Sequence, residues 1–308
     1  MIRNKRYLQR EPDDPRKKWV PIGCGECIEC RKLKVKEWLA RLTEELKNPQ
    51  KSLFVTLTFK DEILNKFINE YEKPNLIAAK AIELFRKRWH AEKKASIKYW
   101  LITELGDERT ERLHLHGIIW GEKTEDIEKI WGYGHIYAGT YVNEKTIRYI
   151  VKYVTKQDEK HPEFKGKIFC SKGIGKGFIN EFNKKKYKYT EGNTKEFLKT
   201  PSGLKVGLPI YYRNKLWNDD EREDLWMERL NKKERFVCGE RIDISTTKGI
   251  ENYYKCLEYH QLRTKRLGYK EPVWDNKKYK KNLENINNYP NFEKKQDYDE
   301  GTDHQNTP

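Results

Sequence analysis

The sequence predicts an α+β fold in which helices pack on a central antiparallel sheet of about five strands, in a ferredoxin-like arrangement. Short β-branched and aromatic runs, typical of strands, alternate with longer segments of helical periodicity. Two such runs, 98–104 and 113–120, are separated by a polar turn that begins at Gly106, which indicates a β-hairpin. The second run is apolar on both faces apart from its histidines, as expected of a central strand.

The elements of the predicted sheet domain follow one another in the order α-β-α-β-β-α-β-α. Strands are expected at 52–59, 98–104, 113–120 and 133–137. Helices are expected at 31–47, 76–95, 123–131 and 143–157, with a further helix near 219–231.

Apolar residues at helical spacing define one side of each of the two long helices. They are Val35, Trp38, Leu39, Leu42 and Leu46 in the first, and Ala78, Ile82, Phe85 and Trp89 in the second. Basic residues of 31–41 and 80–93 occupy the opposite sides, where we expect contact with a nucleic-acid backbone.

Composition divides the chain into an N-terminal arm at 1–22, a main domain at 23–235 and a C-terminal extension at 236–308. The arm is polar and contains three prolines, so we expect it to be extended. The last ~35 residues are rich in Lys, Asn, Glu and Asp and have few apolar side chains, so we expect them to be mobile.

The charge balance favours a polyanionic partner. The formal net charge is +16, and 19 Tyr and 9 Trp are interleaved with the basic residues, a combination suited to single-stranded nucleic acid. No apolar stretch is long enough to cross a membrane, so no membrane partner is expected. We expect the six cysteines to be reduced or metal-bound, as in a cytoplasmic protein.

His114-Leu-His116 lies within the predicted strand 113–120. Alternate side chains of a strand share one face, so both imidazoles can reach a single metal ion. Glu104 ends the preceding strand, and a tight hairpin would bring its carboxylate beside them. Two imidazoles and one carboxylate leave open positions for a water and a phosphate oxygen. The alternative is a pair of ordinary core histidines.

The predicted helix 143–157 carries a second group of chemically active side chains. At about 100° per residue, the apolar side formed by Ile147, Ile150, Val151 and Val154 lies opposite Tyr149, Lys152, Tyr153 and Lys156. A phenol beside an ammonium group or a metal can act as a nucleophile on a phosphodiester. The alternative is aromatic packing against a neighbouring helix.

Two further motifs bear on ligands. Cys24, Cys27 and Cys30 have a spacing suited to zinc, for which Cys170 or a histidine would supply the fourth ligand; a reduced, metal-free cluster is the alternative. The glycine-rich segment 171–177 could present amides to a DNA phosphate. It lacks the spacing of a nucleotide-binding P-loop.

In this order, these motifs resemble those of the HUH endonucleases, and more closely the rolling-circle replication initiation proteins of microviruses, especially the gokushovirus group. The resemblance covers about 20–217 and rests on Cys24-x-x-Cys27-x-x-Cys30-Arg31, Phe54-Val-Thr-Leu-Thr-Phe59, Glu104-x-Gly106, His114-Leu-His116-Gly, Trp131-Gly-Tyr-Gly134, Tyr149-x-x-Lys-Tyr153-Val-x-Lys156, Ser171-Lys-Gly-Ile-Gly-Lys-Gly177 and Leu208-Pro-Ile-Tyr211-Tyr212.

The resemblance implies an HUH endonuclease domain at 23–235 in which His114, His116 and Glu104 bind Mg²⁺ or Mn²⁺. It makes Tyr149 and Tyr153 alternating nucleophiles, and Lys152 and Lys156 ligands of the scissile phosphate. Such an enzyme nicks the origin strand, keeps its 5′ end as a phosphotyrosine and later rejoins the strand. The sequence does not rank the two tyrosines.

The implied partners are the single-stranded DNA origin, a host helicase and the host replication machinery, in the cytoplasm of a host bacterium. A plasmid initiator or a transposase would use the same chemistry. From another class, a non-catalytic nucleic-acid-binding protein with a zinc knuckle would explain the charge and the cysteines. It would not explain the histidines and tyrosines as a set.

Overall fold

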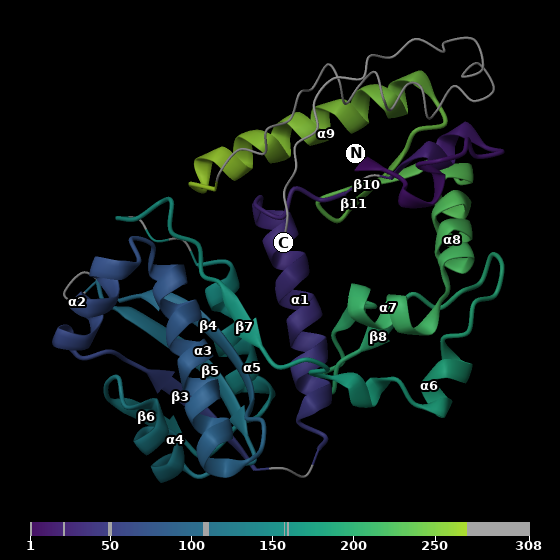
Figure 1. Cartoon of the computed structure of the whole chain (residues 1–308). Helices are drawn as coiled ribbons and strands as arrows, with labels where there is room; N and C mark the ends of the chain where they lie inside the picture. The colour runs from purple at the N-terminus through teal and green to yellow at the C-terminus, as the bar shows by residue number, and fades with distance from the viewer. Residues whose placement is uncertain are drawn as a thin grey trace. The chain divides into compact units, whose positions relative to one another are not determined.

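A computed structural model describes residues 2–20, 22–48, 51–106, 111–156, 158 and 160–269 (Figure 1). These residues fall into two compact units, which divide after Gly25. The first unit contains two short antiparallel strands, β1 (Ile2–Arg3) and β2 (Trp19–Val20), so the N-terminal segment forms a strand pair where we expected an extended arm. The predicted mobile tail, from about residue 271, lies outside the described residues.

The second unit is built on an antiparallel sheet of five strands in the order β6-β3-β5-β4-β7. The strands are β3 (Ser52–Leu57), β4 (Lys98–Leu105), β5 (Leu113–Trp120), β6 (Ile136–Gly139) and β7 (Ile168–Cys170). The α+β class and the five-stranded antiparallel sheet are therefore confirmed, and β5 lies at the centre as predicted.

Helices cover both faces of this sheet (Figure 1). One face packs against α3 (Pro74–Lys93) and α4 (Thr124–Trp131), in a core that includes Leu115, Phe85 and Trp131. The other face packs against α1 (Ile28–Glu45) and α5 (Glu144–Val151), in a core that includes Leu42, Ile118 and Ile150. A short helix, α2 (Asp61–Glu70), was not predicted because it contributes no fully buried side chain.

The rest of this unit follows the sheet in sequence. It contains η3 (Lys152–Val154), η4 (Lys176–Phe178), α6 (Glu181–Lys186), β8 (Phe197–Lys199), β9 (Lys205–Gly207), α7 (Ile210–Leu216), α8 (Asp219–Asn231), β10 (Glu234–Val237), β11 (Glu240–Asp243) and α9 (Thr247–Arg266). Helix α8 lies where a helix was predicted. Within the described ranges, no helix combines the length and apolar character needed to cross a membrane.

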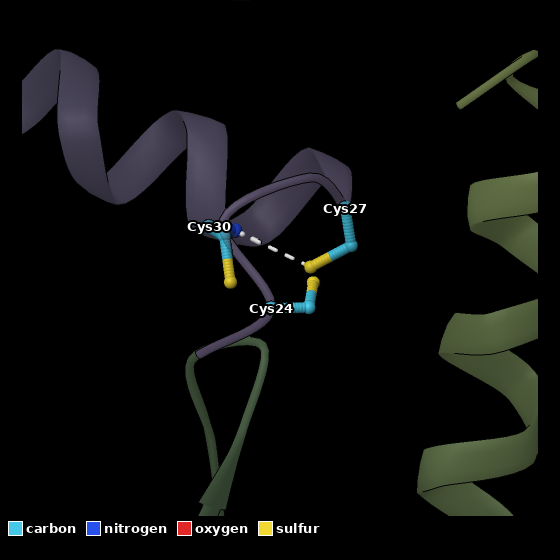
Figure 2. Close-up of side chains that lie close together, drawn as sticks. All are labelled: Cys24, Cys27 and Cys30. Atoms are coloured by element: carbon cyan, nitrogen blue, oxygen red, sulfur yellow. Dashed lines mark hydrogen bonds between the residues drawn. The ribbon is translucent and has the colours of Figure 1, made fainter. Parts of the chain in front are cut away.

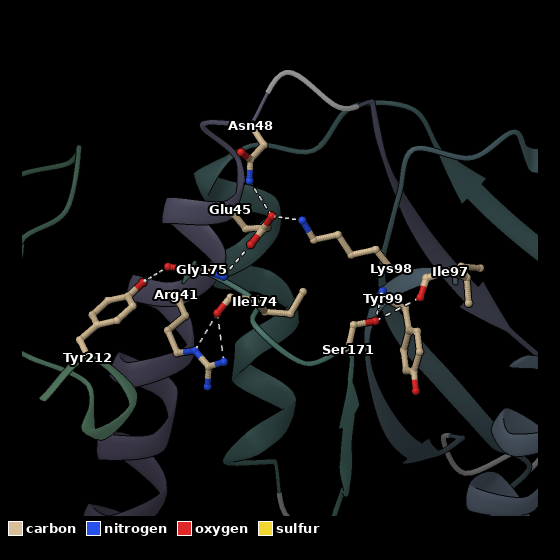
Figure 3. A network of polar contacts seen from close by, with 10 residues as sticks. All are labelled: Arg41, Glu45, Asn48, Ile97, Lys98, Tyr99, Ser171, Ile174, Gly175 and Tyr212. Carbon is tan, nitrogen blue, oxygen red and sulfur yellow. Dashed lines mark hydrogen bonds and ion pairs between the residues drawn. The ribbon is translucent and has the colours of Figure 1, made fainter. Parts of the chain in front are cut away.

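The glycine-rich segment 171–177 docks on the last turns of α1 (Figure 3). The amide of Gly175 donates to a carboxylate oxygen of Glu45 at 2.5 Å, and Glu45, which is 1% exposed, also pairs with Lys98. The Arg41 guanidinium donates to the carbonyl of Ile174. The amide of Gly175 is therefore already bonded within the protein, which contradicts our expectation that it faces a DNA phosphate.

Arg41 also departs from the prediction that the basic side of the first helix faces nucleic acid. Its guanidinium lies 4.2 Å from the ring centroids of both Trp38 and Tyr211, so it is sandwiched between two aromatic side chains. Arg31, on the same helix, is buried and stacks on Tyr269. These two arginines hold the fold together and are not available as a DNA-facing surface.

We expect Gly175→Ala to destabilise the protein by about 3 kcal/mol, because a side chain there is strained and crowded. The residue has φ +77°, and an added Cβ would lie 2.7 Å from the Arg41 carbonyl oxygen and 2.7 Å from the Tyr212 hydroxyl. Gly192→Ala is the matched control: φ is +72°, nothing lies within 4 Å, and the cost should be about 1 kcal/mol. Urea unfolding measures both; equal losses would contradict the packing argument.

Candidate active site

The two histidines of β5 lie on the face of the sheet that packs against α5. Leu113 and Leu115 belong to the core under α3, while Ile118 belongs to the core under α5, so the strand alternation turns His114 and His116 towards α5. The strand register places Glu104 of β4 directly opposite His114. It also places Thr56 of β3 directly opposite His116.

His116 is held by partners on both ring nitrogens. Its Nδ1 lies 2.9 Å from the Thr56 hydroxyl, and its Nε2 lies 2.6 Å from a carboxylate oxygen of Glu104. An ionised carboxylate only accepts, so Nε2–H donates to Glu104. Sequence reasoning missed Thr56; the only available signal was its alternate position within the predicted strand 52–59.

The electrostatic balance at Glu104 favours the charged carboxylate. Burial alone would raise the pKa of Glu104, but hydrogen bonds from His116 and Lys156, together with their charges, hold that pKa below its ordinary value. The pKa of His114 is also lowered, by burial first and then by the neighbouring His116. A neutral imidazole at His114 is the form that binds a metal ion.

The three predicted ligands approach one another without closing on a single point. The ring centroids of His114 and His116 are 6.2 Å apart. Among the described residues, the candidate ligand atoms of Glu104, His114 and His116 do not all lie within 4.8 Å of one another. Coordination of one ion by all three therefore requires a side-chain movement.

The tyrosines lie against the histidines. The Tyr153 ring stacks on the His116 ring, with centroids 4.8 Å apart and planes at 3°. The hydroxyl groups of Tyr149 and Tyr153 are 2.8 Å apart and hydrogen-bonded. Tyr149 is 45% exposed, whereas Tyr153 is 8% exposed. Burial, the hydrogen bond to Tyr149 and the charge of Glu104 raise the pKa of Tyr153.

The different exposure of the two tyrosines follows from the way the helix ends. Helix α5 begins at a capping box, in which the Asn143 side chain accepts from the Thr146 amide, and it ends at Val151. The chain continues as the 3₁₀ turn η3, which has about 3.0 residues per turn. The predicted polar side of 143–157 is therefore not continued, and Tyr153 turns into the core where we expected it beside Tyr149 on the exposed side.

Both predicted lysines lie at the site. The Lys152 ammonium is 4.0 Å from the centroid of the Tyr149 ring, and it is also near the Tyr153 ring. The Lys156 ammonium pairs with Glu104 and lies 5.7 Å from the centroid of the Tyr153 ring. Two cations and two phenols thus surround the histidine and glutamate pair.

The cysteine cluster lies at the start of α1 (Figure 2). The sulfur atoms of Cys24, Cys27 and Cys30 are all within 4.8 Å of one another. Cys27 caps the helix, because its sulfur accepts from the amide of Cys30 at 3.5 Å. Cys170, suggested as a fourth ligand, lies in β7 beside the core under α5, and among the described residues it belongs to no group of candidate ligands.

Comparison with known proteins locates the chain among replication proteins. Residues 52–158 match a protein family described as replication-associated protein ORF2. The chain is 28% identical to the replication-associated protein ORF2 of Spiroplasma virus 4, over 73% of this chain and 78% of that protein. It is 23% identical to the replication-associated protein VP4 of Bdellovibrio phage phiMH2K, over 67% and 70% respectively. No solved structure matches.

We expect part of the stability of the protein below neutral pH to depend on Glu104. Because its pKa is depressed in the folded state, its ion pairs contribute fully above the unfolded pKa of about 4.5 and are lost as the pH falls through the folded pKa. The difference in free energy of unfolding between wild type and Glu104→Gln should therefore be larger at about pH 6 than at about pH 3. Glu62→Gln, an exposed change on α2, is the control. A difference independent of pH would show that Glu104 is not charged in the folded protein.

Proposed function

We propose that this chain, a relative of the replication-associated proteins of small single-stranded DNA phages as its sequence predicted, starts rolling-circle replication by nicking and later rejoining the origin strand. The family match supports the replication role. The observation that supports the chemistry is the stack of Tyr153 on His116, with the Tyr149 hydroxyl 2.8 Å from the Tyr153 hydroxyl. Two candidate nucleophiles thereby lie beside the candidate metal ligands.

The donor set suits a divalent cation such as Mg²⁺ or Mn²⁺. His114, His116 and Glu104 supply two imidazoles and one carboxylate, and Thr56 fixes Nδ1 of His116 so that Nε2 faces the carboxylate. A cation bound by these side chains would polarise the scissile phosphodiester. The pairing of Lys156 with the Glu104 carboxylate supports this assignment, because it places positive charge at the same position.

Tyr149 is the first nucleophile in this proposal. It is the more exposed phenol, its hydroxyl is hydrogen-bonded to Tyr153, and the Lys152 ammonium lies over its ring. Its phenolic oxygen bonds to phosphorus, the bond from phosphorus to O3′ breaks, and the phenolic proton ends on the released 3′ hydroxyl. The phosphotyrosine ester keeps the energy of the broken phosphodiester, so rejoining needs no ATP.

Tyr153 performs the second transfer. Its raised pKa disfavours the phenolate, and Glu104 contributes to that shift, so attack by Tyr153 requires the negative charge of Glu104 to be offset. Once Tyr149 is esterified, its hydroxyl no longer bonds to Tyr153. The pair can therefore act in sequence at one site.

The partners of this activity are the single-stranded DNA origin, the host replication machinery and a host helicase, in the cytoplasm of the host bacterium. A separate helicase is needed because the sequence contains no nucleotide-binding P-loop. The newly released 3′ hydroxyl would prime synthesis by the host polymerase.

Covalent capture on DNA tests the nucleophiles. With single-stranded oligonucleotides that tile the viral genome and Mn²⁺, Tyr149→Phe should reduce the SDS-resistant adduct at least about 100-fold. Tyr153→Phe should keep the first nick and lose rejoining. Tyr141→Phe, which alters a tyrosine that is 78% exposed, is the matched control. An adduct formed by the variant with both Tyr149→Phe and Tyr153→Phe would refute the assignment of the nucleophiles.

Metal dependence tests the histidines separately. His114→Ala and His116→Ala should each reduce Mn²⁺-dependent nicking at least about 100-fold while DNA binding, followed by fluorescence anisotropy, changes little. His90→Ala, on the exposed side of α3, should behave as wild type. Nicking that persists in excess EDTA would rule out the metal.

A further inference from the structure

A second group of metal-binding side chains lies where α9 and the hairpin β10–β11 meet the start of α1. Candidate ligand atoms of Glu29, Cys238 and His260 lie within 4.8 Å of one another, and so do those of Glu240, Cys256 and His260. An ion pair of 3.4 Å between Arg263 of α9 and Glu29 of α1 joins the same elements. None of these residues takes part in the proposed nicking reaction.

His260 has the arrangement expected of a metal-binding histidine. It is 7% exposed, and its Nε2 lies 2.8 Å from a carboxylate oxygen of Glu240. Its other ring nitrogen, Nδ1, is buried and has no hydrogen-bond partner among the described residues. A carboxylate that holds one ring nitrogen fixes the tautomer and directs the lone pair of the other nitrogen to a metal. A buried nitrogen without any partner is otherwise costly.

Cys238 occupies a position that a cysteine rarely takes. It forms the two-residue turn between β10 and β11 with Gly239, and both have positive φ, +54° and +90°. Such a turn favours Asn or Gly at its first central position, and a cysteine there is strained. Strained positions gather at functional sites, where the surrounding structure holds them.

Cys27 and Cys30 bring the start of α1 into this group. The sulfur of Cys27 accepts from the Cys30 amide, and the positive end of the helix stabilises a thiolate there. Burial, followed by the negative charges of Glu29, Cys27 and Cys256, raises the pKa of Cys238 to about 12. The thiols of Cys27 and Cys238 are therefore neighbours in the same cluster.

We propose that Cys27, Cys30, Cys238 and His260 bind one structural zinc ion, which ties hairpin β10–β11 and helix α9 to the first turn of α1. Three thiolates and one imidazole form a closed tetrahedral set that favours zinc over Mg²⁺ or Ca²⁺. Glu240 orients His260, and Glu29 is already paired with Lys32 and Arg263. Neither carboxylate is needed as a ligand.

The zinc ion also has a consequence near the nicking site. Just beyond α9, the Tyr269 hydroxyl donates to the carbonyl of Thr155 at 2.7 Å, next to Lys156 in sequence. The Tyr269 ring also stacks on Arg31 of α1. A metal that fixes α9 to α1 therefore stabilises the backbone that carries Lys156.

The metal content of the full-length protein, purified in the presence of zinc, tests the proposal by mass spectrometry of the metal. Wild type should hold one zinc ion per chain, and Cys238→Ser and His260→Ala should lose zinc at least about tenfold. Cys170→Ser, which alters a cysteine of β7, is the matched control and should keep it. Absence of zinc from wild type, or its full retention by Cys238→Ser and His260→Ala, would overturn the proposal.

Two further variants guard against loss of folding. His260→Cys preserves four zinc ligands and should retain the metal that His260→Ala loses. Glu240→Gln keeps all four ligands and should weaken zinc about 10–100-fold, because it alters the orienting carboxylate. Replacement of zinc by Co²⁺ should give the spectrum of a tetrahedral, sulfur-rich site. A Co²⁺ spectrum unchanged by Cys238→Ser would place the metal elsewhere.

Discussion

The position of β5 at the centre of the sheet is the constraint on which the rest of the structure depends. Because β5 is paired on both sides, its alternation is fixed: Leu115 enters one core and His116 faces the other. Gly117 makes the close pairing possible, since an added Cβ would lie 2.0 Å from the carbonyl oxygen of Trp100. The glycine that follows the histidines is therefore needed by the sheet and not by the chemistry.

Glu104 connects the histidines to the tyrosines electrostatically. It accepts from His116, pairs with Lys156 and contributes to raising the pKa of Tyr153. One carboxylate thus stabilises positive charge at the ligand position and opposes negative charge on the nearer phenol. Tyr149 reaches solvent while Tyr153 lies under it, so the environment of the two nucleophiles differs although their chemistry is the same. This asymmetry is the physical basis for an order of attack.

Sequence patterns predicted the parts of the site that depend on local geometry. Strand alternation was enough to place His114, His116 and Glu104 together, because the pairing of β4 with β5 is a short hairpin. The inward turn of Tyr153 was not predicted, because the change from α-helix to a 3₁₀ turn at Lys152 leaves no pattern in the sequence. Contacts between distant segments, such as Glu45 with Gly175, were equally invisible.

Helix α1 links the two candidate sites of the unit. Its first turn carries Cys30 and is preceded by Cys27, and its last turn carries Glu45, which holds Gly175. Between these ends, Leu39 and Leu42 pack in the same core as Tyr153. A helix anchored at both ends presents a fixed surface beneath the tyrosine. Since a displacement of about 1 Å is enough to cost catalytic geometry, that rigidity gives the cysteines a role in a reaction they do not touch.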